Sequence, residues 1–297
     1  MNEQQAMKVG LMGTGLMGNP MGIRLLNAGL TVTVYNRTAS KLQSLEEAGA
    51  IALSRPQLVL ESADYIILML TDAQAINQVL FDSKPDNSKQ LELLQNKLVI
   101  QMATIAPDQS KAISDRVSAA GGSYLEAPVL GSIPQVKTGE LIIMVGGSSQ
   151  NFERSLPLLK NFSPQPILVG EVGAASAMKL ALNQLIAGLT SSFALSLGFV
   201  KKQNVDVEQF MQILRDSALY APTFDKKLTR MSDRNFSNPN FPTKHLLKDT
   251  NLFLEQAQSI GLATDSLTGI QAIIQKAITL GLENEDYSAI YQAIDPE

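Results

Sequence analysis

Short apolar segments alternate with amphipathic stretches along the first half of the chain, and this alternation limits the possible folds more than any other feature. The apolar segments have the length of β-strands, and they are residues 8–12, 30–35, 65–70, 98–101, 123–126, 141–145 and 166–169. Helices are expected between them, at residues 17–28, 73–80, 108–120 and 151–160. Strands that are apolar on both faces and separated by helices predict a mainly parallel sheet that helices cover on each side.

The strand pattern ends near residue 170, and the remainder of the chain has helical periodicity. A long helix is expected over residues 172–202, with shorter helices over 206–217, 248–260 and 264–280. The segment 221–244 is rich in Pro, Asn and Ser, so a loop is expected there. The 297 residues are enough for two domains, and the pattern predicts an α/β domain over residues 1–168 and an all-helical domain over residues 169–297.

Composition excludes several kinds of site. The chain has no cysteine, which rules out disulfides, thiolate metal sites and cysteine nucleophiles. It has one histidine, His245, which argues against a histidine-based metal site and against a Ser–His–Asp triad. With 24 Lys and Arg against 28 Asp and Glu, the net charge is -4, and no basic field favours nucleic acid as a partner.

The uncharged segment 180–200 is long enough to cross a bilayer. It contains several amide and hydroxyl side chains, and this favours a helix buried inside a soluble protein or at a subunit interface over a membrane span. We therefore expect no membrane association and an oligomer, most simply a homodimer, with a homotetramer as the alternative. Residues 1–6 lack the basic start and apolar core of an export signal, so a cytoplasmic protein is expected.

A glycine-rich pattern follows the first predicted strand. Gly13, Gly15 and Gly18 form a GxGxxG sequence between that strand and the next predicted helix, which is the context that dinucleotide binding requires. The first glycine permits the tight turn, the second lets the backbone approach a pyrophosphate, and the third lets the helix pack on the sheet. The alternative is an ordinary glycine turn. The expected cofactor-binding residues of this segment are Gly10, Leu11, Met12, Gly13, Gly15, Leu16 and Met17.

The end of the second predicted strand indicates which cofactor is bound. An NAD site has an acidic residue about twenty residues after the glycines, and none is present at positions 35–38. Asn36 can hydrogen-bond a ribose oxygen, and Arg37, aided by the Thr38 hydroxyl, can pair with a 2′-phosphate. We therefore predict a preference for NADP(H), with NAD(H) as a second cofactor. The alternative is that Thr38 caps a helix and Arg37 is merely exposed.

The long predicted helix carries a lysine and an asparagine four residues apart. Lys179 and Asn183 therefore lie on one helical face. Reduction of a carbonyl needs a proton donor at the developing alkoxide, which an ammonium group supplies, and an asparagine amide can orient the substrate. On spacing alone, a lysine whose stem packs along the helix while its ammonium reaches solvent is an equally good interpretation.

Together these motifs resemble those of the β-hydroxyacid dehydrogenase family. The resemblance extends over nearly the whole chain, and it rests on residues 10–18, 36–38, 104–107 and 126–129, on Gly173, Lys179 and Asn183, and on Lys248 and Asp249. It implies a Rossmann-type, doubly wound domain joined by the long helix to a helical domain, with the active site in the cleft between them. The residue roles that it implies are Lys179 as the acid/base, Asn183 at the substrate, Leu70, Thr71 and Thr104 at the nicotinamide and ribose, and Lys248 at the cofactor and substrate.

One segment departs from the family pattern. The family usually has Ser-Gly-Gly or Ser-Gly-Ser after residues 126–129, where it binds the substrate carboxylate, whereas this chain has Leu130, Gly131 and Ser132. The backbone of Gly131 and the hydroxyl of Ser132 remain as the expected contacts to a small carboxylate-bearing carbonyl or hydroxy acid. The loss of the first serine leaves the details of carboxylate binding open.

Residues 241–249 are similar to the glyoxylate and succinic semialdehyde reductase branch of the family. In this segment His245 is expected to be a packing or cleft-lining residue. Asp249 is expected either to orient Lys248 or to be a first-turn carboxylate favoured by the helix dipole.

The resemblance therefore predicts an NADP(H)-dependent oxidoreductase that reduces small aldehyde or 2-oxo acids, with Lys179 as the proton donor. A 3-hydroxyisobutyrate-type dehydrogenase, working in the oxidative direction, is the nearest alternative. Imine reductases resemble the family but often lack the lysine. Non-catalytic cofactor-binding modules usually lack it too and carry an added recognition domain. The presence of Lys179 favours the hydroxyacid chemistry over both.

Overall fold

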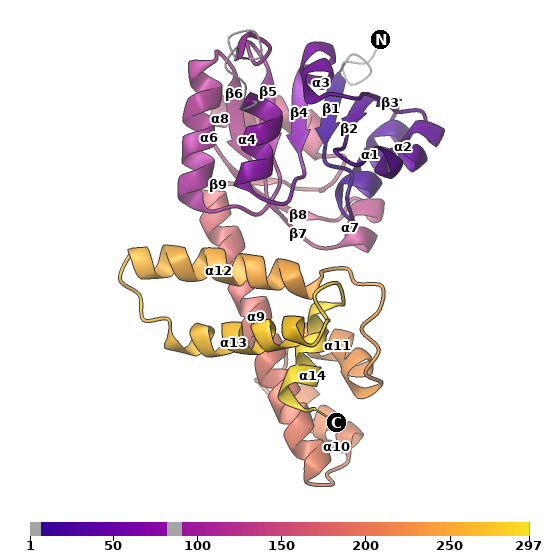
Figure 1. Ribbon diagram of the computed structural model, residues 1–297, viewed down its shortest axis with the longest axis vertical. Coiled ribbons are helices and arrows are strands. Elements are labelled where there is room, and N and C mark those ends of the chain that lie inside the picture. Colours follow the sequence, from indigo (N-terminus) through magenta and orange to yellow (C-terminus); the bar gives the residue numbers. More distant parts are fainter. Residues whose placement is uncertain (1–6, 82–90, 297) are drawn as a thin grey trace. The chain divides into compact units, whose positions relative to one another are not determined.

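The computed structural model of the protein describes residues 7–81 and 91–296, and the chain forms two compact units (Figure 1). Unit 1 is Met1–Lys179 and unit 2 is Leu180–Glu297. The division falls within one long helix, α9 (Ala174–Lys202), because the first turn of α9 is hydrogen-bonded to unit 1 and later turns pack with the helices of unit 2. The predicted boundary after residue 168 lies shortly before this helix.

Unit 1 is built on one mainly parallel sheet with the strand order β3-β2-β1-β4-β5-β6-β8-β7, and β9 pairs with β8. The strands are β1 (Lys8–Met12), β2 (Thr31–Tyr35), β3 (Ile51–Ala52), β4 (Tyr65–Leu68), β5 (Leu98–Gln101), β6 (Ser123–Glu126), β7 (Val129–Leu130), β8 (Ile142–Gly146) and β9 (Ile167–Gly170). Strand β8 is antiparallel to β6 and β7, and the other pairs are parallel. The order of β1 to β6 is that of a dinucleotide-binding sheet, so the predicted Rossmann-type fold is confirmed.

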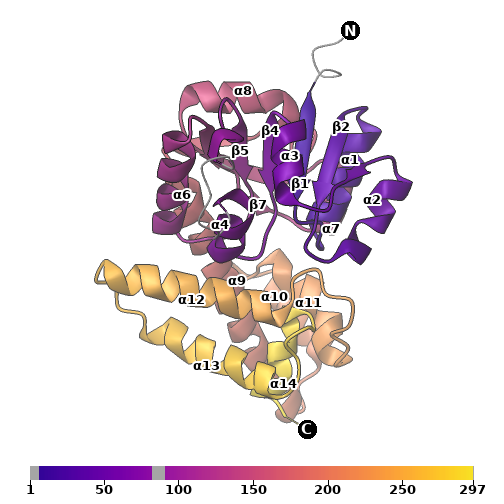
Figure 2. The same cartoon turned by 45° about the horizontal axis from the view of Figure 1, so that its top comes forward.

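Two apolar clusters lie on opposite faces of this sheet, because successive strand residues point to opposite sides. Val9 and Leu11 of β1 pack in the cluster that contains α1, α7 and α8, whereas Met12 packs in the cluster that contains α3, α4 and α6. Figures 1 and 2 show helices on both sides of the strands. The helices of unit 1 are α1 (Gly18–Asn27), α2 (Gln43–Glu47), α3 (Pro56–Ser62), α4 (Ala73–Phe81), α6 (Pro107–Ala119), α7 (Ile133–Thr138) and α8 (Ser149–Leu159).

Most elements of unit 1 begin and end within a few residues of their predicted positions. The strand predicted at residues 65–70 ends earlier, at Leu68, because Met69 already belongs to the loop that leads into α4. The short elements β3, β7, α2, α3 and α7 were not expected. Each of them spans seven residues or fewer, which is too short for a hydrophobic period to be visible.

Unit 2 is all-helical, as predicted. Ala187 of α9 packs in an apolar cluster with residues of α12 and α13, and Phe193 and Leu197 of α9 pack in a second cluster with residues of α10 and α11. The helices that join α9 in this unit are α10 (Val207–Arg215), α11 (Pro222–Ser232), α12 (Thr243–Ser259), α13 (Asp265–Thr279) and α14 (Ile290–Ile294).

Two expectations for unit 2 were wrong. Helix α12 begins at Thr243 and not near residue 248, and α11 lies inside the segment 221–244 that was expected to be a loop. Pro222 stands in the first turn of α11, where a missing N–H leaves no hydrogen bond unmade. A proline in that position starts a helix, although the same residue is also typical of a loop.

Helix α9 is the segment of the described chain whose length and hydropathy would allow it to cross a membrane. In its most apolar window, 44% of the residues are buried inside the structure. Phe193, Ala194 and Leu197 of this helix are part of an apolar cluster of unit 2. The core helix of a soluble protein has the same length and composition, so α9 is weak evidence for a membrane span.

Candidate active site

Most residues predicted to bind the cofactor lie in loops at one edge of the unit 1 sheet, whereas Gly10, Leu11 and Met12 belong to β1, and Lys248 belongs to α12 of unit 2. Strands β1, β2, β4 and β5 run parallel, so their carboxyl ends meet at this edge, which is where ligands of such sheets bind. Backbone hydrogen bonds of 2.9–3.0 Å join the first residue of each loop to the last residue of a neighbouring strand, from Gly13 N to Tyr35 O, from Met69 N to Met12 O and from Met102 N to Leu68 O. The predicted contacts at Leu70, Thr71 and Thr104 follow β4 and β5 and lie in the same set of loops, with Thr71 exposed and the other two half-buried.

The glycine-rich loop has the geometry that its sequence predicts. Gly13 has a φ of +97°, and a side chain there would collide with the backbone carbonyl of Met69. A side chain at Gly18 would collide with the carbonyl of Gly13, so this glycine lets α1 start directly against the turn. At Gly15 a side chain would meet nothing within 4 Å. The open space over Gly15 fits the close approach of a pyrophosphate to backbone at a helix N-terminus.

Asn36 fastens the glycine-rich loop to the loop after β2. Its Nδ2 donates to Thr14 Oγ1 at 2.9 Å, and its Oδ1 accepts from Thr38 N at 2.9 Å. Thr14 Oγ1 in turn donates to the carbonyl of Lys41 at 3.1 Å. An amide has two donor hydrogens and two acceptor lone pairs, so Asn36 keeps one of each for a ribose oxygen. Its first role, which the sequence did not reveal, is to hold the two loops together.

A cavity of about 640 Å³ opens beside these loops. Thr14 and Gly15 line it from the glycine-rich loop, and Lys41 and Ser44 line it from the segment after β2. Arg37 and Thr38 are exposed, and Thr38 stands at the N-cap position of a short 3-10 helix, residues 39–41, without a side-chain capping bond. The alternative in which Thr38 caps a helix through its hydroxyl therefore does not apply.

Lys41 is a candidate cofactor contact that sequence reasoning missed. It is the last residue of the 3-10 helix, and it lines the cavity. The sequence does contain a cation three residues after Thr38. One turn of 3-10 helix has three residues, so it brings the side chain of that cation back towards the end of β2. Arg37 and Lys41 are thus two cations in the segment where a 2′-phosphate would be bound.

The turn expected to bind the substrate carboxylate begins at the end of β7. Gly131 has a φ of +133°, and a side chain there would lie 2.7 Å from Leu141 Cδ2, so only glycine fits. Ser132 Oγ donates to Gln135 Oε1 at 2.9 Å, and Ser132 N donates to the same oxygen at 3.0 Å. The hydroxyl of Ser132 therefore stabilises the start of α7. To donate to a carboxylate it must leave Gln135, which keeps its bond to the backbone N–H.

Lys179 is half-buried in the second turn of α9, and Asn183 is buried one turn further on. The side chains share one face of the helix, as their spacing predicts. The start of α9 is held by a buried carboxylate, that of Glu126, the last residue of β6. Glu126 belongs to a motif noticed in the sequence, but its contact with α9 was not predicted.

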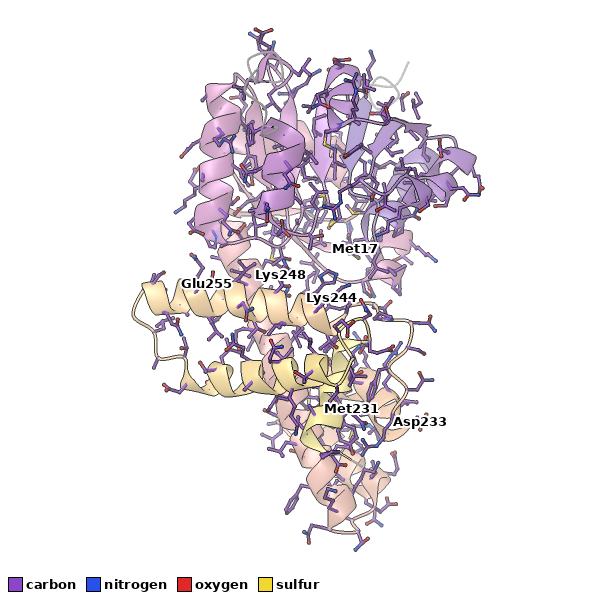
Figure 3. All side chains as sticks on the ribbon, viewed as in Figure 1. Met17, Met231, Asp233, Lys244, Lys248 and Glu255 are labelled. Carbon is purple, nitrogen blue, oxygen red and sulfur yellow. The ribbon has the colours of Figure 1, made fainter. Side chains whose placement is uncertain are left out.

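In unit 2, Asn183 and Lys248 are brought together through Asp249. Asn183 Nδ2 donates to Asp249 Oδ2 at 2.6 Å, and Lys248 Nζ forms an ion pair with Asp249 Oδ1 at 2.8 Å. Figure 3 shows Lys248 and Lys244 on the same helix, α12. Because α12 begins at Thr243, Asp249 is not a first-turn residue, and the interpretation as a dipole-favoured carboxylate is wrong. The alternative, that Asp249 orients Lys248, agrees with the ion pair.

His245 packs beside an aromatic ring and is half-buried. Its ring and that of Phe241 are stacked with centroids 6.3 Å apart. Burial lowers the pKa of His245 below its usual 6.5, and the nearby charge of Lys248 lowers it further. These contacts agree with the expected packing role. Among the residues that the structure describes, no group of three or more His, Asp or Glu side chains could hold a metal ion.

The sheet order, the glycine-rich loop and the helical second unit define a nicotinamide-dependent oxidoreductase of the Rossmann class. Residues 8–170 match the family described as the NAD-binding domain of 6-phosphogluconate dehydrogenase. Residues 173–294 match the NAD-binding family of NADP-dependent 3-hydroxyisobutyrate dehydrogenase. The chain belongs to the β-hydroxyacid dehydrogenase family, and it is an NAD(P)-dependent oxidoreductase of the hydroxyacid dehydrogenase type.

Similar proteins match this chain from end to end. Glyoxylate/succinic semialdehyde reductase 1 of Arabidopsis thaliana is 32% identical over 288 residues, which cover 97% of this chain and 98% of that protein. The 2-hydroxy-3-oxopropionate reductase of Escherichia coli K12 is 33% identical over 292 residues, 97% of each chain. The structure of Mycobacterium tuberculosis 3-hydroxyisobutyrate dehydrogenase with L-serine has a TM-score of 0.84 at 20% identity, covers 97% of this chain and 99% of its own, and shows the same fold.

Proposed function

We propose that the protein is an NADPH-dependent reductase of small carboxylate-bearing aldehydes and 2-oxo acids, of the glyoxylate and succinic semialdehyde class. The observation that carries this proposal is the pair of Lys179 and Asn183 on one face of α9. It occurs in a chain that is 32% identical, along 97% of its length, to a reductase of these acids. The pair supplies the proton donor and the orienting amide that carbonyl reduction requires.

The preference for NADP(H) is supported by the charges after β2. No acidic residue occupies positions 35–38, where an NAD site holds the ribose hydroxyls. Arg37 and Lys41 are exposed cations in this segment, and Lys41 lines the cavity beside Gly15. Charged hydrogen bonds from these groups to a 2′-phosphate favour NADP(H) over NAD(H).

The chemical step divides between the cofactor and the chain. When bound, the cofactor would supply a hydride to the carbonyl carbon of the substrate. The carbonyl oxygen then gains the electron pair of the C=O double bond, and Lys179 Nζ donates a proton to it, so that the product is a hydroxy acid. Lys179 recovers its proton from solvent. The buried Oδ1 of Asn183 accepts no hydrogen bond within the described chain, and it is available to the hydroxyl group of the product.

The substrate carboxylate is assigned to the turn after β7. The backbone N–H of Gly131 and the hydroxyl of Ser132 are the donors there, in place of the serine that the family usually has at position 130. Lys248 is proposed as a further contact to cofactor and substrate, with its ammonium oriented by Asp249 at 2.8 Å. The roles of Leu70, Thr71 and Thr104 at the nicotinamide and ribose stay predictions, as does a cytoplasmic location.

Oxidation of 3-hydroxyisobutyrate is a second candidate function. It is favoured by the match of residues 173–294 to the family of NADP-dependent 3-hydroxyisobutyrate dehydrogenase. The same residues serve both directions, since a neutral Lys179 accepts the proton that the charged one donates. Imine reduction and a non-catalytic role gain no support from the site, because Lys179 and Asn183 are both present.

A homodimer through α9 is proposed as the assembly. Leu185, Leu195 and Phe199 are 50%, 62% and 65% exposed. With Gly188 and Ser192 between them they recur every three or four residues, the spacing by which two helices pack along their length. A second copy of this apolar face of α9 is therefore the partner that fits.

Light scattering of Leu195→Glu and of the matched control Ile213→Glu, on the exposed face of α10, tests this proposed dimer. We expect a monomer only for the first, and a monomeric parent protein would contradict the proposal.

The experiment that tests the proposed reaction is a panel of cofactor-consumption assays. Glyoxylate, succinic semialdehyde, methylmalonate semialdehyde and a cyclic imine are each supplied with NADPH and with NADH, and 3-hydroxyisobutyrate with NADP⁺. We expect the highest kcat/KM with NADPH and glyoxylate or succinic semialdehyde. A higher value for 3-hydroxyisobutyrate oxidation would select the second candidate, and turnover of the imine alone would contradict both.

A further inference from the structure

Glu126 is a fully buried carboxylate that accepts five hydrogen bonds. Its Oε1 accepts from the backbone N–H groups of Gly173, Ala175 and Ser176 at 2.9, 2.7 and 3.0 Å. Its Oε2 accepts from the hydroxyls of Ser110 and Ser176 at 2.5 and 2.6 Å. The three backbone donors belong to the start of α9, where N–H groups have no partner within the helix. One side chain at the end of β6 therefore satisfies the N-terminus of the helix that carries Lys179.

These bonds fix the helix itself, since they are made to its backbone. A negative charge at a helix N-terminus is also favoured by the helix dipole. Lys179 follows Ser176 by three residues, and an α-helix advances about 1.5 Å per residue. The Cα atom of Lys179 thus lies within about one turn of the anchored N–H groups. Its position follows from theirs as long as the helix stays intact.

Neighbouring residues restrict the position of the Glu126 carboxylate. Gly146 lies opposite Glu126 in the antiparallel pair of β6 and β8, and a side chain on Gly146 would lie 2.5 Å from Oε1. On the other side, the hydroxyl of Tyr124 lies 2.8 Å from Ser110 Oγ. Burial raises the pKa of Tyr124, so the phenol keeps its proton and donates to Ser110, whose own hydroxyl donates to Glu126.

The chain leading away from Glu126 reaches the predicted carboxylate-binding turn within six residues. Residues 129–130 form β7, which pairs with β8 and holds the turn at Gly131 and Ser132 in place. The residue whose carboxylate holds the first turn of α9 is therefore joined to this turn through a short stretch of chain that β8 fixes on both sides, at Glu126 and at β7. We propose that Glu126 is a positioning residue that sets the distance between Lys179 and the substrate carboxylate. This inference rests on the proposed function.

Substitutions of Glu126 distinguish an effect on the position of Lys179 from an effect on the stability of the protein. Glu126→Gln keeps an oxygen for the three N–H groups and an amide that donates to the serine hydroxyls, so it keeps the geometry without the charge. Glu126→Asp keeps the charge, but its side chain is shorter by one methylene group, so the carboxylate lies farther from the N–H groups of α9. Glu126→Ala removes the anchor, and Gly146→Ala displaces the carboxylate without removing it. Asp206→Ala is the matched control, because Asp206 caps α10 by accepting from Gln209 N at 2.7 Å.

The kinetics should divide these variants into two groups. A displacement of about 1 Å can cost on the order of 100-fold in rate. We therefore expect Glu126→Asp, Glu126→Ala and Gly146→Ala to lose about 10–100-fold in kcat while the Kd of NADPH changes less than threefold. Glu126→Gln should keep kcat within threefold, and so should Asp206→Ala. Rates are expressed per NADPH-binding site, so that an unfolded fraction does not count as lost activity.

The positioning role is overturned if Glu126→Asp and Gly146→Ala have the kcat of the parent protein. It is also overturned if Glu126→Gln loses as much as Glu126→Ala, because the charge and not the geometry would then be responsible. If Glu126→Ala does not fold, the Asp and Gly146 variants decide alone.

Hydrogen exchange of the segment 173–179 tests the anchor separately from the reaction. It should be at least tenfold faster in Glu126→Ala, and Glu126→Asp serves for this measurement as well if the alanine variant does not fold. Unchanged exchange in both contradicts the inference even if the reductase is active. A parent protein that reduces none of the acids contradicts the proposed function, while faster exchange in the variants would still establish the anchor.

Discussion

Asn183 Nδ2 donates a 2.6 Å hydrogen bond to Oδ2 of Asp249, across two helices of unit 2 that are far apart in sequence. The bond determines how the Asn183 amide is turned, because a carboxylate accepts only from the NH₂ end. The oxygen of Asn183 is thereby left as a buried acceptor. Asp249 also forms an ion pair with Lys248 at 2.8 Å, so one carboxylate orients two of the predicted site residues.

Replacing Asp249 with alanine should therefore impair substrate binding more than cofactor binding. A hydrogen bond to a charged group contributes about 1.5–3 kcal/mol, and each 1.4 kcal/mol is about a factor of ten. We expect kcat/KM for the acid to fall about 10–100-fold in Asp249→Ala. Asp265→Ala, an exposed carboxylate in the first turn of α13, is the control and should leave kcat/KM unchanged. A loss of less than threefold in Asp249→Ala would show that Asn183 needs no anchor.

The single histidine gives a direct test of the environment near Asp249. Burial lowers the pKa of His245, and the charges of Lys248 and Lys244 lower it further, while Asp249 acts in the opposite direction. The NMR signals of the ring, which belong to one residue because the chain has one histidine, should titrate with a midpoint below 6.5. A midpoint above 6.5 would mean that Asp249 dominates over burial.

The same shift predicts a pH dependence of stability. The folded protein favours the neutral ring, so the unfolded chain takes up a proton first as the pH falls below 6.5. The free energy of unfolding should therefore decrease as the pH falls from about 6.5 towards the pKa of His245 in the folded protein. Above about pH 6.5 the ring is neutral in both states, and His245 should contribute no such decrease. Denaturant titrations of the parent and of His245→Gln at pH 7.5 and 5.5 measure the contribution, and the variant should lose less stability over this interval.

Several strands of the sheet could be predicted because short apolar segments alternate with helical stretches along the first half of the chain. The buried strands β1, β5 and β6 begin and end where the apolar runs do. Helix α11 was missed because Pro222 is typical of loops as well as of first helical turns. The start of α12 was placed five residues too late, since the helix begins at Thr243 directly after Pro242.

The residue types of the candidate site could be proposed from the sequence, but their contacts could not. Lys179, Asn183 and the glycines stand in local patterns whose spacing carries the information. Glu126 is 47 residues from Gly173, and Asn183 is 66 residues from Asp249, so neither hydrogen bond leaves a local trace. The part of the site that depends on which distant segments are joined therefore had to come from the structure.

The cofactor preference depends on cations and can be tested at two positions. Arg37→Ala and Lys41→Ala should each weaken NADPH binding by about 1.5–3 kcal/mol, the value of a charged hydrogen bond, and should barely change NADH binding. Arg55→Ala, another exposed arginine of unit 1, is the control. Calorimetric titration of both cofactors into each protein measures the difference. Equal losses for NADPH and NADH would contradict contacts to the 2′-phosphate.

Substrate selection is expected to depend on Leu130, which replaces a family serine and is half-buried beside the turn at Gly131. If the backbone of Gly131 and Ser132 carries the carboxylate, Leu130→Ser should change KM by less than about tenfold, which is less than 1.4 kcal/mol. The removal of a bulky apolar group should still shift the preference among acids of different length. An unchanged ratio of kcat/KM for glyoxylate and succinic semialdehyde would show that residue 130 does not face the substrate.

The central prediction is that Lys179 is the proton donor. Loss of a general acid reduces the rate by about 10²–10⁴-fold, whereas most of the proposed cofactor contacts lie in the loops at the sheet edge. Lys179→Ala should therefore bind NADPH within a few-fold of the parent protein and lose at least about 100-fold in kcat. Lys179→Arg should not restore activity, because a guanidinium does not release its proton near neutrality. Asn183→Ala should reduce the rate less, through a misplaced substrate.

A matched substitution on the same helix separates this role from packing. Lys201→Ala removes a lysine near the end of α9, where the ammonium lies 5.8 Å from the centre of the Tyr291 ring, and it should leave kcat unchanged. Thermal unfolding of both variants shows whether either loss comes from instability. If Lys179→Ala keeps more than a tenth of the parent kcat, the lysine is a packing residue of α9, and the proton must come from another group or from water.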